Sequence, residues 1–157
     1  MRIGYGFDIH QFESGDGFTL GGVKITFNKK IIAHSDGDVL IHAICDALLG
    51  ASALGDIGKH FPDTKSKFKN ISSLILLKKV STLLKENNFE ISNIDSTIVL
   101  QSPKIISFVD EMRNKISSVL EIELNQISIK ATTNENLDAI GNEKGIAAHA
   151  VALIFKK

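Results

Sequence analysis

The sequence lacks three features that would assign it to a specialised class of protein. It has a single cysteine, Cys45, and therefore forms neither an intrachain disulfide nor a zinc site built on paired cysteines. Basic and acidic residues each number 18, which argues against a general nucleic-acid binder and a polybasic membrane-surface protein. The longest apolar region, residues 39–54, is interrupted by His42 and Asp46 and is too short to cross a bilayer. We therefore expect no nucleic-acid or membrane partner, and a cytoplasmic location, or a plastid-type organelle if a targeting segment was removed.

What is present is the composition of a globular chain. Its 157 residues are 43% hydrophobic and 23% charged, which fits one domain spanning residues 1–157. Alternating apolar residues predict strands at 2–9, 91–100, 127–132 and 146–155, and a hairpin at 18–27. Helical periodicity predicts helices at 38–53, 70–87 and 104–120. This order predicts an α+β fold, with helices packed on one face of a mixed sheet.

Asp8 and His10 form the first candidate site. They are separated by one residue in the first predicted strand, so their side chains point to the same face. A carboxylate beside an imidazole suits a divalent metal ion such as zinc. Because such pairs also occur by chance, this pair alone does not define a site.

A second polar group surrounds the start of the first predicted helix. Residues 34–42 read His-Ser-Asp-Gly-Asp-Val-Leu-Ile-His. Asp38, His42 and Asp46 recur every four residues and therefore share one helix face. In one interpretation the aspartates cap the helix or lie on the surface, and His42 is solvated. The apolar neighbours of His42 and Asp46 favour a second interpretation, because an unpaired polar group among them would be costly.

In that second interpretation the strand and the helix share a metal. Asp8, His10 and His42 would supply two nitrogens and one oxygen, the three-ligand set of a catalytic zinc with a fourth position open. Asp38 or Asp46 would be the partner that fixes the orientation of a ligand ring.

A third polar group follows the predicted strand at 127–132. Residues 130–135 read Lys-Ala-Thr-Thr-Asn-Glu. The hydroxyls of Thr132 and Thr133, with nearby backbone N–H groups, can hold phosphate oxygens, and Glu135 suits Mg²⁺ or Mn²⁺ on a diphosphate. A polar turn after a strand explains these residues equally well when they are taken alone.

These segments, in this order, closely resemble the 2-C-methyl-D-erythritol 2,4-cyclodiphosphate synthase family. The resemblance is carried by Gly-Phe-Asp-Ile-His at 6–10, the run at 34–63, Gln-Ser-Pro-Lys at 101–104, and the segment at 130–135. It covers nearly the whole chain, and the run at 34–63 is its most specific part. The resemblance implies a ferredoxin-like α+β fold and a homotrimer with sites at the subunit interfaces.

The resemblance also implies a reaction. In 4-diphosphocytidyl-2-C-methyl-D-erythritol 2-phosphate, the 2-phosphate attacks the β-phosphorus and CMP leaves, which closes 2-C-methyl-D-erythritol 2,4-cyclodiphosphate. Because the nucleophile is already an anion, the protein mainly has to bring two anionic groups together and stabilise charge.

Roles for individual residues follow from the same resemblance. It implies one zinc ion per subunit, bound by Asp8, His10 and His42, and a second divalent ion, Mg²⁺ or Mn²⁺, bound by Glu135. The phosphate-binding residues would be His34, Ser35, Thr132 and Thr133. The methylerythritol-binding residues would be Asp56, Ile57, Gly58, Phe61 and Asp63. The cytidine-binding residues would be Leu100, Pro103, Lys104, Ile105, Ile106 and Ala131.

Two other hypotheses stand beside this one. A zinc-dependent phosphate-ester hydrolase would hold hydroxide at the open metal position, and would need a general base, for which only Asp46 stands out. A catalytically idle metal- or nucleotide-binding module would bind without turnover, although the intact ligand residues argue against it. Reaction products separate the first two, because a cyclase releases CMP and a cyclic diphosphate, whereas a hydrolase gives a linear phosphate.

Overall fold

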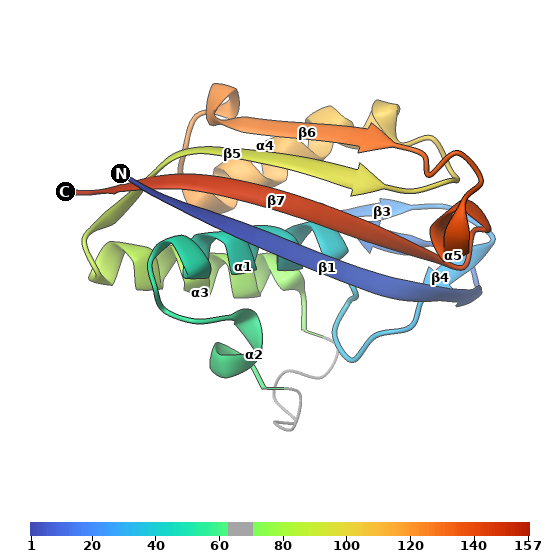
Figure 1. The fold of residues 1–157 in the computed structure, drawn as a ribbon, viewed down its shortest axis with the longest axis horizontal. Coiled ribbons are helices and arrows are strands. Elements are labelled where there is room, and N and C mark those ends of the chain that lie inside the picture. The colour runs from blue at the N-terminus through green and yellow to red at the C-terminus, as the bar shows by residue number, and fades with distance from the viewer. Residues whose placement is uncertain (63–70) are drawn as a thin grey trace.

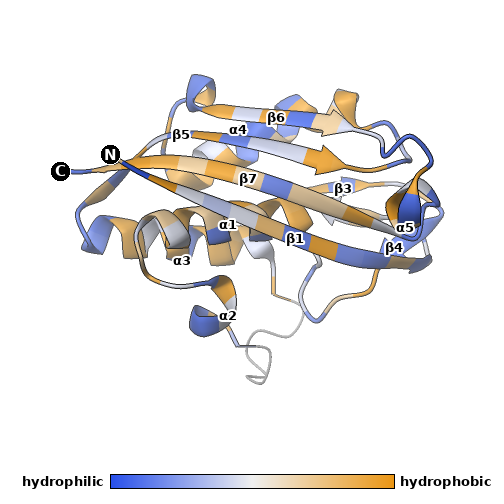
Figure 2. Ribbon diagram, in the orientation of Figure 1, coloured by the Kyte–Doolittle hydropathy of each residue, from blue (hydrophilic) through white to orange (hydrophobic). Residues whose placement is uncertain are grey.

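A computed structural model describes residues 1–62 and 71–157 as a mixed sheet with helices on one face (Figure 1). The five strands of this sheet, in the order β4-β1-β7-β5-β6, are β4 (Lys29–Ile31), β1 (Arg2–Ser14), β7 (Gly145–Lys156), β5 (Phe89–Val99) and β6 (Ile127–Thr132). Strands β5 and β6 are parallel, and the other neighbours are antiparallel. Figure 2 shows that the central strand β7 is hydrophobic along most of its length. A separate hairpin consists of β2 (Phe18–Leu20) and β3 (Val23–Ile25).

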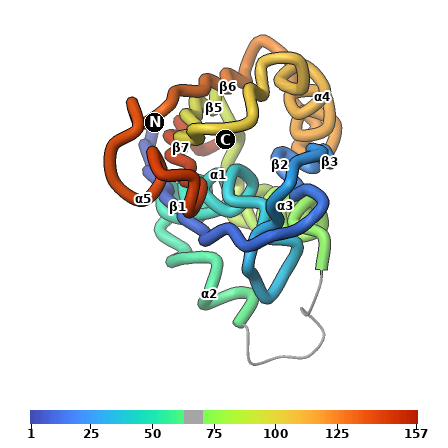
Figure 3. The backbone as a smooth tube through the Cα atoms, turned by 90° about the vertical axis from the view of Figure 1, so that its right-hand side faces the viewer, coloured from blue at the N-terminus to red at the C-terminus, as the bar shows by residue number. Residues whose placement is uncertain are grey.

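Three longer helices cover the same face of the sheet (Figure 3): α1 (Val39–Ala51), α3 (Ser73–Glu86) and α4 (Val109–Leu120). The short helical segments are α2 (Ile57–His60), α5 (Asp138–Gly141) and the 3₁₀ turns at Ile106–Phe108 and Leu124–Gln126. This arrangement confirms the predicted α+β fold. Within residues 1–62 and 71–157, every helix is too short or too polar to span a membrane.

The contact between β1 and α1 depends on glycine. A Cβ atom on Gly6 would lie 2.0 Å from the carbonyl oxygen of Ala43 and 2.7 Å from the nitrogen of Ala47. One on Gly4 would lie 2.0 Å from the carbonyl oxygen of Ala47. The strand backbone therefore lies directly on the helix, and the residues that follow Gly6 in β1 are brought to the first turns of α1.

Asp38 fixes the start of α1. Its carboxylate accepts hydrogen bonds from the backbone N–H groups of Gly21 at 2.9 Å, Gly22 at 2.7 Å and Ile41 at 3.1 Å. The last of these is a helix N-cap bond, and the first two tie the turn of the β2–β3 hairpin to the helix.

The polar face of α1 is narrow. Only His42, Asp46 and Gly50 in this helix are not fully buried, and their four-residue spacing places them on one side. The helix face that carries His42 and Asp46, which the sequence identifies by its polar residues, is therefore the one side of α1 that is not buried.

Two predicted elements differ from the structure. Strand β1 continues to Ser14 and pairs there with β4, a three-residue strand that is too short to show alternation. The helix predicted from residue 104 begins at Val109, after a 3₁₀ turn. Asp110 and Glu111 lie in its first turn, where acidic side chains stabilise a helix N-terminus.

Candidate active site

Asp8, His10 and His42 meet at the junction of β1 and α1. Asp8 Oδ2 lies 2.9 Å from His42 Nδ1 and 3.4 Å from His10 Nε2. The two imidazole rings stand edge to face, with centroids 5.7 Å apart. One ligand atom from each residue lies within 4.8 Å of the others, so these side chains can hold a single metal ion.

The surroundings of the two histidines shift their pKa values in opposite directions. His10 Nε2 is buried and has no hydrogen-bond partner among the described residues. Burial lowers the pKa of His10, and the charge of Asp8 offsets this only in part, so the ring favours its neutral, metal-binding form. Burial also acts to lower the pKa of His42, but the hydrogen bond and charge of Asp8, together with the charges of Asp38 and Asp36, outweigh it and raise this pKa above its ordinary value. The negative charge that stabilises a protonated His42 also favours a bound cation, and the spacing of the three ligand atoms is compatible with a divalent metal.

A cavity of about 210 Å³ opens beside the triad. Its walls include five residues that the sequence predicts to bind phosphate or methylerythritol: His34, Ser35, Ile57, Gly58 and Phe61. Asp56 caps the adjoining helix α2, where its Oδ1 accepts a hydrogen bond of 2.8 Å from the nitrogen of Lys59. Asp63, the remaining predicted residue, lies outside the described residues.

The two carboxylates expected to orient a ligand ring have other partners. Asp38 is engaged by three backbone N–H groups, and burial raises its pKa. Asp46 accepts a hydrogen bond of 2.7 Å from the nitrogen of Ile57, and burial raises its pKa as well. Asp46 therefore holds the start of α2 in place beside the cavity. The hydrogen bond that the structure gives it is to this backbone and not to an imidazole ring.

The ring of His42 is instead contacted by a residue that sequence reasoning missed. Ser73 Oγ, at the start of α3, lies 2.9 Å from His42 Nε2 and is hydrogen-bonded to the carboxylate of Asp36. Asp36 belongs to the polar run at 34–42, but its link to Ser73 spans 37 positions. Nothing in the spacing of the sequence signals such a contact.

The predicted nucleotide residues gather elsewhere, at the carboxyl ends of the parallel strands β5 and β6. The two loops there are joined by a hydrogen bond of 3.1 Å from Gln101 Nε2 to Asn136 Oδ1, and Leu100 N bonds to Thr132 O at 3.0 Å. Glu135 has a left-handed backbone, with φ of 49°, and its carboxylate accepts a 2.9 Å hydrogen bond from Thr133 Oγ1. The loop that follows β5 therefore lies beside the segment that follows β6, and we call residues 100–106 and 131–135 together the nucleotide cluster.

In one chain this cluster and the triad are separate. One row of paired residues crosses the sheet at this level: Ile9 of β1, Ala147 of β7, Val99 of β5 and Thr132 of β6. Ile9 lies between the two strand ligands Asp8 and His10. The two clusters thus lie at the same level of the sheet with two strands between them, roughly 14 Å at the usual strand spacing.

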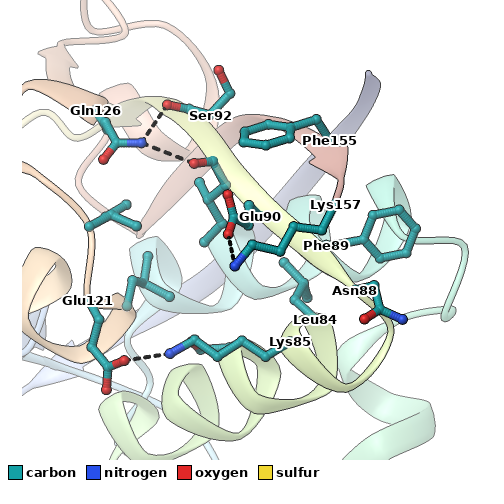
Figure 4. Close-up of a pocket in the computed structure, with 14 residues that line it drawn as sticks. Leu84, Lys85, Asn88, Phe89, Glu90, Ser92, Glu121, Gln126, Phe155 and Lys157 are labelled. Atoms are coloured by element: carbon teal, nitrogen blue, oxygen red, sulfur yellow. Dashed lines mark hydrogen bonds and ion pairs between the residues drawn. The ribbon is translucent and has the colours of Figure 1, made fainter.

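A larger cavity, of about 720 Å³, lies at the other end of the sheet, where the C-terminal residue Lys157 forms part of its lining (Figure 4). It lies between the ends of α3, α4 and β7 and the start of β5, and none of the predicted site residues lines it. Its charged groups are paired, Lys85 with Glu121 and Glu90 with Lys157. We therefore place the candidate active site at the triad.

The fold and the site together define an α+β protein with a candidate divalent-metal centre between a strand and a helix. Residues 1–155 match the YgbB family, and the chain belongs to this family. It is 53% identical over 155 residues to the 2-C-methyl-D-erythritol 2,4-cyclodiphosphate synthase of Azotobacter vinelandii, and 52% identical over 156 residues to that of Pseudomonas fluorescens (strain Pf0-1). In both cases 99% of each chain is covered.

Solved structures agree with this assignment. IspF of Plasmodium falciparum, solved as a CDP complex, has a TM-score of 0.88 and 40% identity, covering 99% of this chain and 96% of that chain. The bifunctional IspDF of Campylobacter jejuni has a TM-score of 0.95 and 42% identity, covering 99% of this chain and 42% of that chain. None of these relatives is named as a phosphate-ester hydrolase, so the hydrolase hypothesis has no support from them.

Proposed function

We propose that this chain is a phosphorus–oxygen lyase of the non-mevalonate isoprenoid pathway that forms 2-C-methyl-D-erythritol 2,4-cyclodiphosphate. The 2-phosphate oxygen of 4-diphosphocytidyl-2-C-methyl-D-erythritol 2-phosphate forms a bond to the β-phosphorus. The bond from this phosphorus to the oxygen shared with the α-phosphate breaks, and CMP leaves with the electron pair. The observation that carries the proposal is the triad of Asp8, His10 and His42 beside a cavity, in a chain 53% identical to a synthase of that name.

Zinc is the ion that we assign to the triad. Two imidazoles and one carboxylate are a ligand set of catalytic zinc. The buried Nε2 of His10 makes no hydrogen bond to the described residues and lies 3.4 Å from Asp8 Oδ2, which supports a cation at this place. When bound, zinc would polarise the β-phosphate as a Lewis acid. Glu135 would hold Mg²⁺ or Mn²⁺ with the diphosphate, since both ions prefer oxygen ligands.

The protein's own groups position the substrate. His34 and Ser35, on the wall of the cavity, would hold phosphate oxygens, as would Thr132 and Thr133. The Asp56 carboxylate and the backbone of Ile57 and Gly58 would hold the methylerythritol hydroxyls, with Phe61 and Asp63 beside them. The residues from Leu100 to Ile106 with Ala131 would bind cytidine.

A homotrimer would complete this site. The triad and the nucleotide cluster are separated by two strands within one chain, so one substrate reaches both more readily if a second chain supplies the nucleotide cluster. The outer face of β1 supports such an assembly, because Ile3, Tyr5, Phe7 and Ile9 are 71%, 61%, 44% and 51% exposed there. An apolar row of this kind is typical of a surface covered by another protein chain.

The product of the reaction tests the proposal. The purified chain is incubated with the cytidine substrate, Zn²⁺ and Mg²⁺, and the products are identified by ³¹P NMR and chromatography. We expect CMP and the cyclic diphosphate in equal amounts, whereas His42→Ala should lose activity. A linear phosphate product would support the hydrolase, and binding of CMP without turnover would support the idle module.

A further inference from the structure

Ser73 is a buried residue next to the triad with no role in the site as proposed so far. It is the first residue of α3 and has no exposed surface. Its Oγ lies 2.9 Å from Nε2 of His42, on the side of the ring opposite Asp8. Ser35 Oγ is also near Nε2, but at 3.4 Å the contact is marginal.

Asp36 holds Ser73 in this position. The Ser73 backbone nitrogen donates a hydrogen bond of 2.8 Å to Asp36 Oδ2, and the Ser73 hydroxyl donates to Asp36 Oδ1. The nitrogen of Asp36 in turn donates to the carbonyl oxygen of Ile71 at 3.3 Å. The start of α3 and the loop before α1 are thus tied together at the point where they reach His42.

The direction of these bonds defines the tautomer of His42. An ionised carboxylate only accepts hydrogen bonds, so the single proton of the Ser73 hydroxyl points to Asp36. The hydroxyl oxygen can then only accept from His42, which places a proton on Nε2. With Nε2 protonated, a second proton on Nδ1 makes the 2.9 Å hydrogen bond to Asp8 Oδ2 in the charged ring. In the neutral ring this position on Nδ1 holds the lone pair, and a cation can take the place of that proton between Nδ1 and Asp8.

We infer that Ser73, held by Asp36, is a positioning residue that locks the tautomer and orientation of His42 so that Nδ1 binds the metal ion. This inference rests on the proposed metal site and goes beyond it, because neither Ser73 nor Asp36 is a ligand. A partner that fixes the second ring nitrogen of a metal-bound histidine typically accounts for a 10- to 100-fold difference in metal affinity.

Metal binding, measured without substrate, tests the inference. The Zn²⁺ affinity of the folded protein is determined by competition with a chromogenic chelator, and the visible spectrum of the Co²⁺-loaded protein reports the ligand geometry. We expect Ser73→Ala to bind Zn²⁺ about 10- to 100-fold more weakly than the unmodified protein, with an altered Co²⁺ spectrum. Ser72→Ala is the matched control, because Ser72 is exposed and makes no side-chain cap bond, so its Zn²⁺ affinity should not change.

Two further variants separate positioning from packing. Asp36→Asn should also weaken Zn²⁺ binding, and it tests the inference even if Ser73→Ala does not fold. The double variant should bind about as well as Ser73→Ala alone, because both changes interrupt one chain of hydrogen bonds. Ser73→Thr, which keeps the hydroxyl, should recover most of the affinity.

Each outcome bears on a different claim. A Zn²⁺ affinity of Ser73→Ala equal to that of the unmodified protein would overturn the positioning role and leave the proposed reaction standing. Failure of the unmodified protein to bind Zn²⁺ would overturn both the metal site and this inference.

Discussion

At the scale of single residues, Asp38 shows how a carboxylate can be buried without a cation. Its side chain has no exposed surface, and three backbone N–H groups supply the hydrogen bonds that water would otherwise make. Because these donors come from the β2–β3 turn and from α1, one side chain supplies hydrogen-bond acceptors to two elements and holds them together. Asp38 is therefore a structural residue beside the site.

Replacement of Asp38 by alanine should destabilise the fold. The change removes a helix cap and leaves the N–H groups of Gly21, which is buried, and of Gly22, which is partly buried, without this acceptor, which we expect to cost about 3 kcal/mol. Urea unfolding followed by circular dichroism measures this difference. Asp16→Ala, at an exposed loop position, is the control and should change the free energy of unfolding by less than about 0.5 kcal/mol. Equal stability of the two variants would contradict this account of Asp38.

Glu121 links stability to pH. Hydrogen bonds from Lys78 and Lys85 lower its pKa from 4.5 to about 2. Since the folded-state pKa lies below the unfolded one, the stabilisation is fully present above pH 4.5 and is lost as the pH falls toward 2. Glu121→Gln should therefore lower the Tm at pH 7 by a small amount, and the difference should disappear near pH 2.

Thermal unfolding of the two proteins across this pH range at low salt is the measurement. In 1 M salt the difference at pH 7 should shrink, because exposed ion pairs are screened. A Tm difference that is independent of both pH and salt would show that Glu121 acts through packing or backbone conformation.

At the scale of elements, the direct contact of β1 with α1 is the feature that builds the site. Asp8 and His10 lie on the strand, and His42 lies on the helix. Their separation is therefore determined by how closely the two backbones approach. Gly6 permits that approach, since a Cβ there would overlap the carbonyl oxygen of Ala43.

Gly6→Ala should therefore damage both the fold and the metal site. We expect a loss of about 3 kcal/mol or more, because the added methyl group meets backbone rather than a movable side chain. Zn²⁺ binding should weaken as β1 moves away from α1. Gly50→Ala is the matched control, because Gly50 is an exposed helix residue whose added Cβ would meet only the carbonyl oxygen of Tyr5, at 4.0 Å, and alanine there should stabilise the protein by about 0.5–1 kcal/mol. Chemical denaturation and chelator competition test both expectations, and unchanged Zn²⁺ binding by folded Gly6→Ala would contradict them.

Local pattern predicted the elements and part of the site. The spacing of His42 and Asp46 identified a polar face on a buried helix, and the spacing of Asp8 and His10 placed both side chains on one face of a strand. The patterns did not predict β4, which is too short to alternate, or the contact of Ser73 with His42, which requires two distant segments to meet. For the same reason they offered Asp38 or Asp46 as the partner of a ligand ring without showing the backbone N–H groups to which these carboxylates are hydrogen-bonded.

At the scale of the whole molecule, the separation of the two clusters makes subunit exchange informative. If each site takes its triad from one chain and its nucleotide cluster from another, chains with different defects should complement each other. His42→Ala and Glu135→Ala should each be inactive alone. Co-expressed, they should recover up to about a quarter of the unmodified activity, the share of interfaces that receive both intact residues in random trimers.

Steady-state release of CMP from the purified, co-expressed mixture is the measurement. Light scattering of the same sample gives the number of chains per particle. The control pairs His42→Ala with His10→Ala, two defects in one cluster, and should recover no activity. Absence of recovery in the first pair, with a trimer present, would show that each chain forms its site alone.

The glycine contact between β1 and α1 also has a consequence for how a metal ion at the triad would be gained and lost. Backbone packing sets the spacing of the ligands, so they are assembled by folding and not by the metal, unlike small zinc domains that unfold without it. We expect the EDTA-treated protein to keep its far-UV circular dichroism and to regain one Zn²⁺ per chain on addition, whereas loss of the helical signal would contradict this. The fraction of chains with bound Zn²⁺ would then depend on the free zinc concentration around the folded protein at any given time. It would not depend on how much zinc was available when the chain was synthesised and folded.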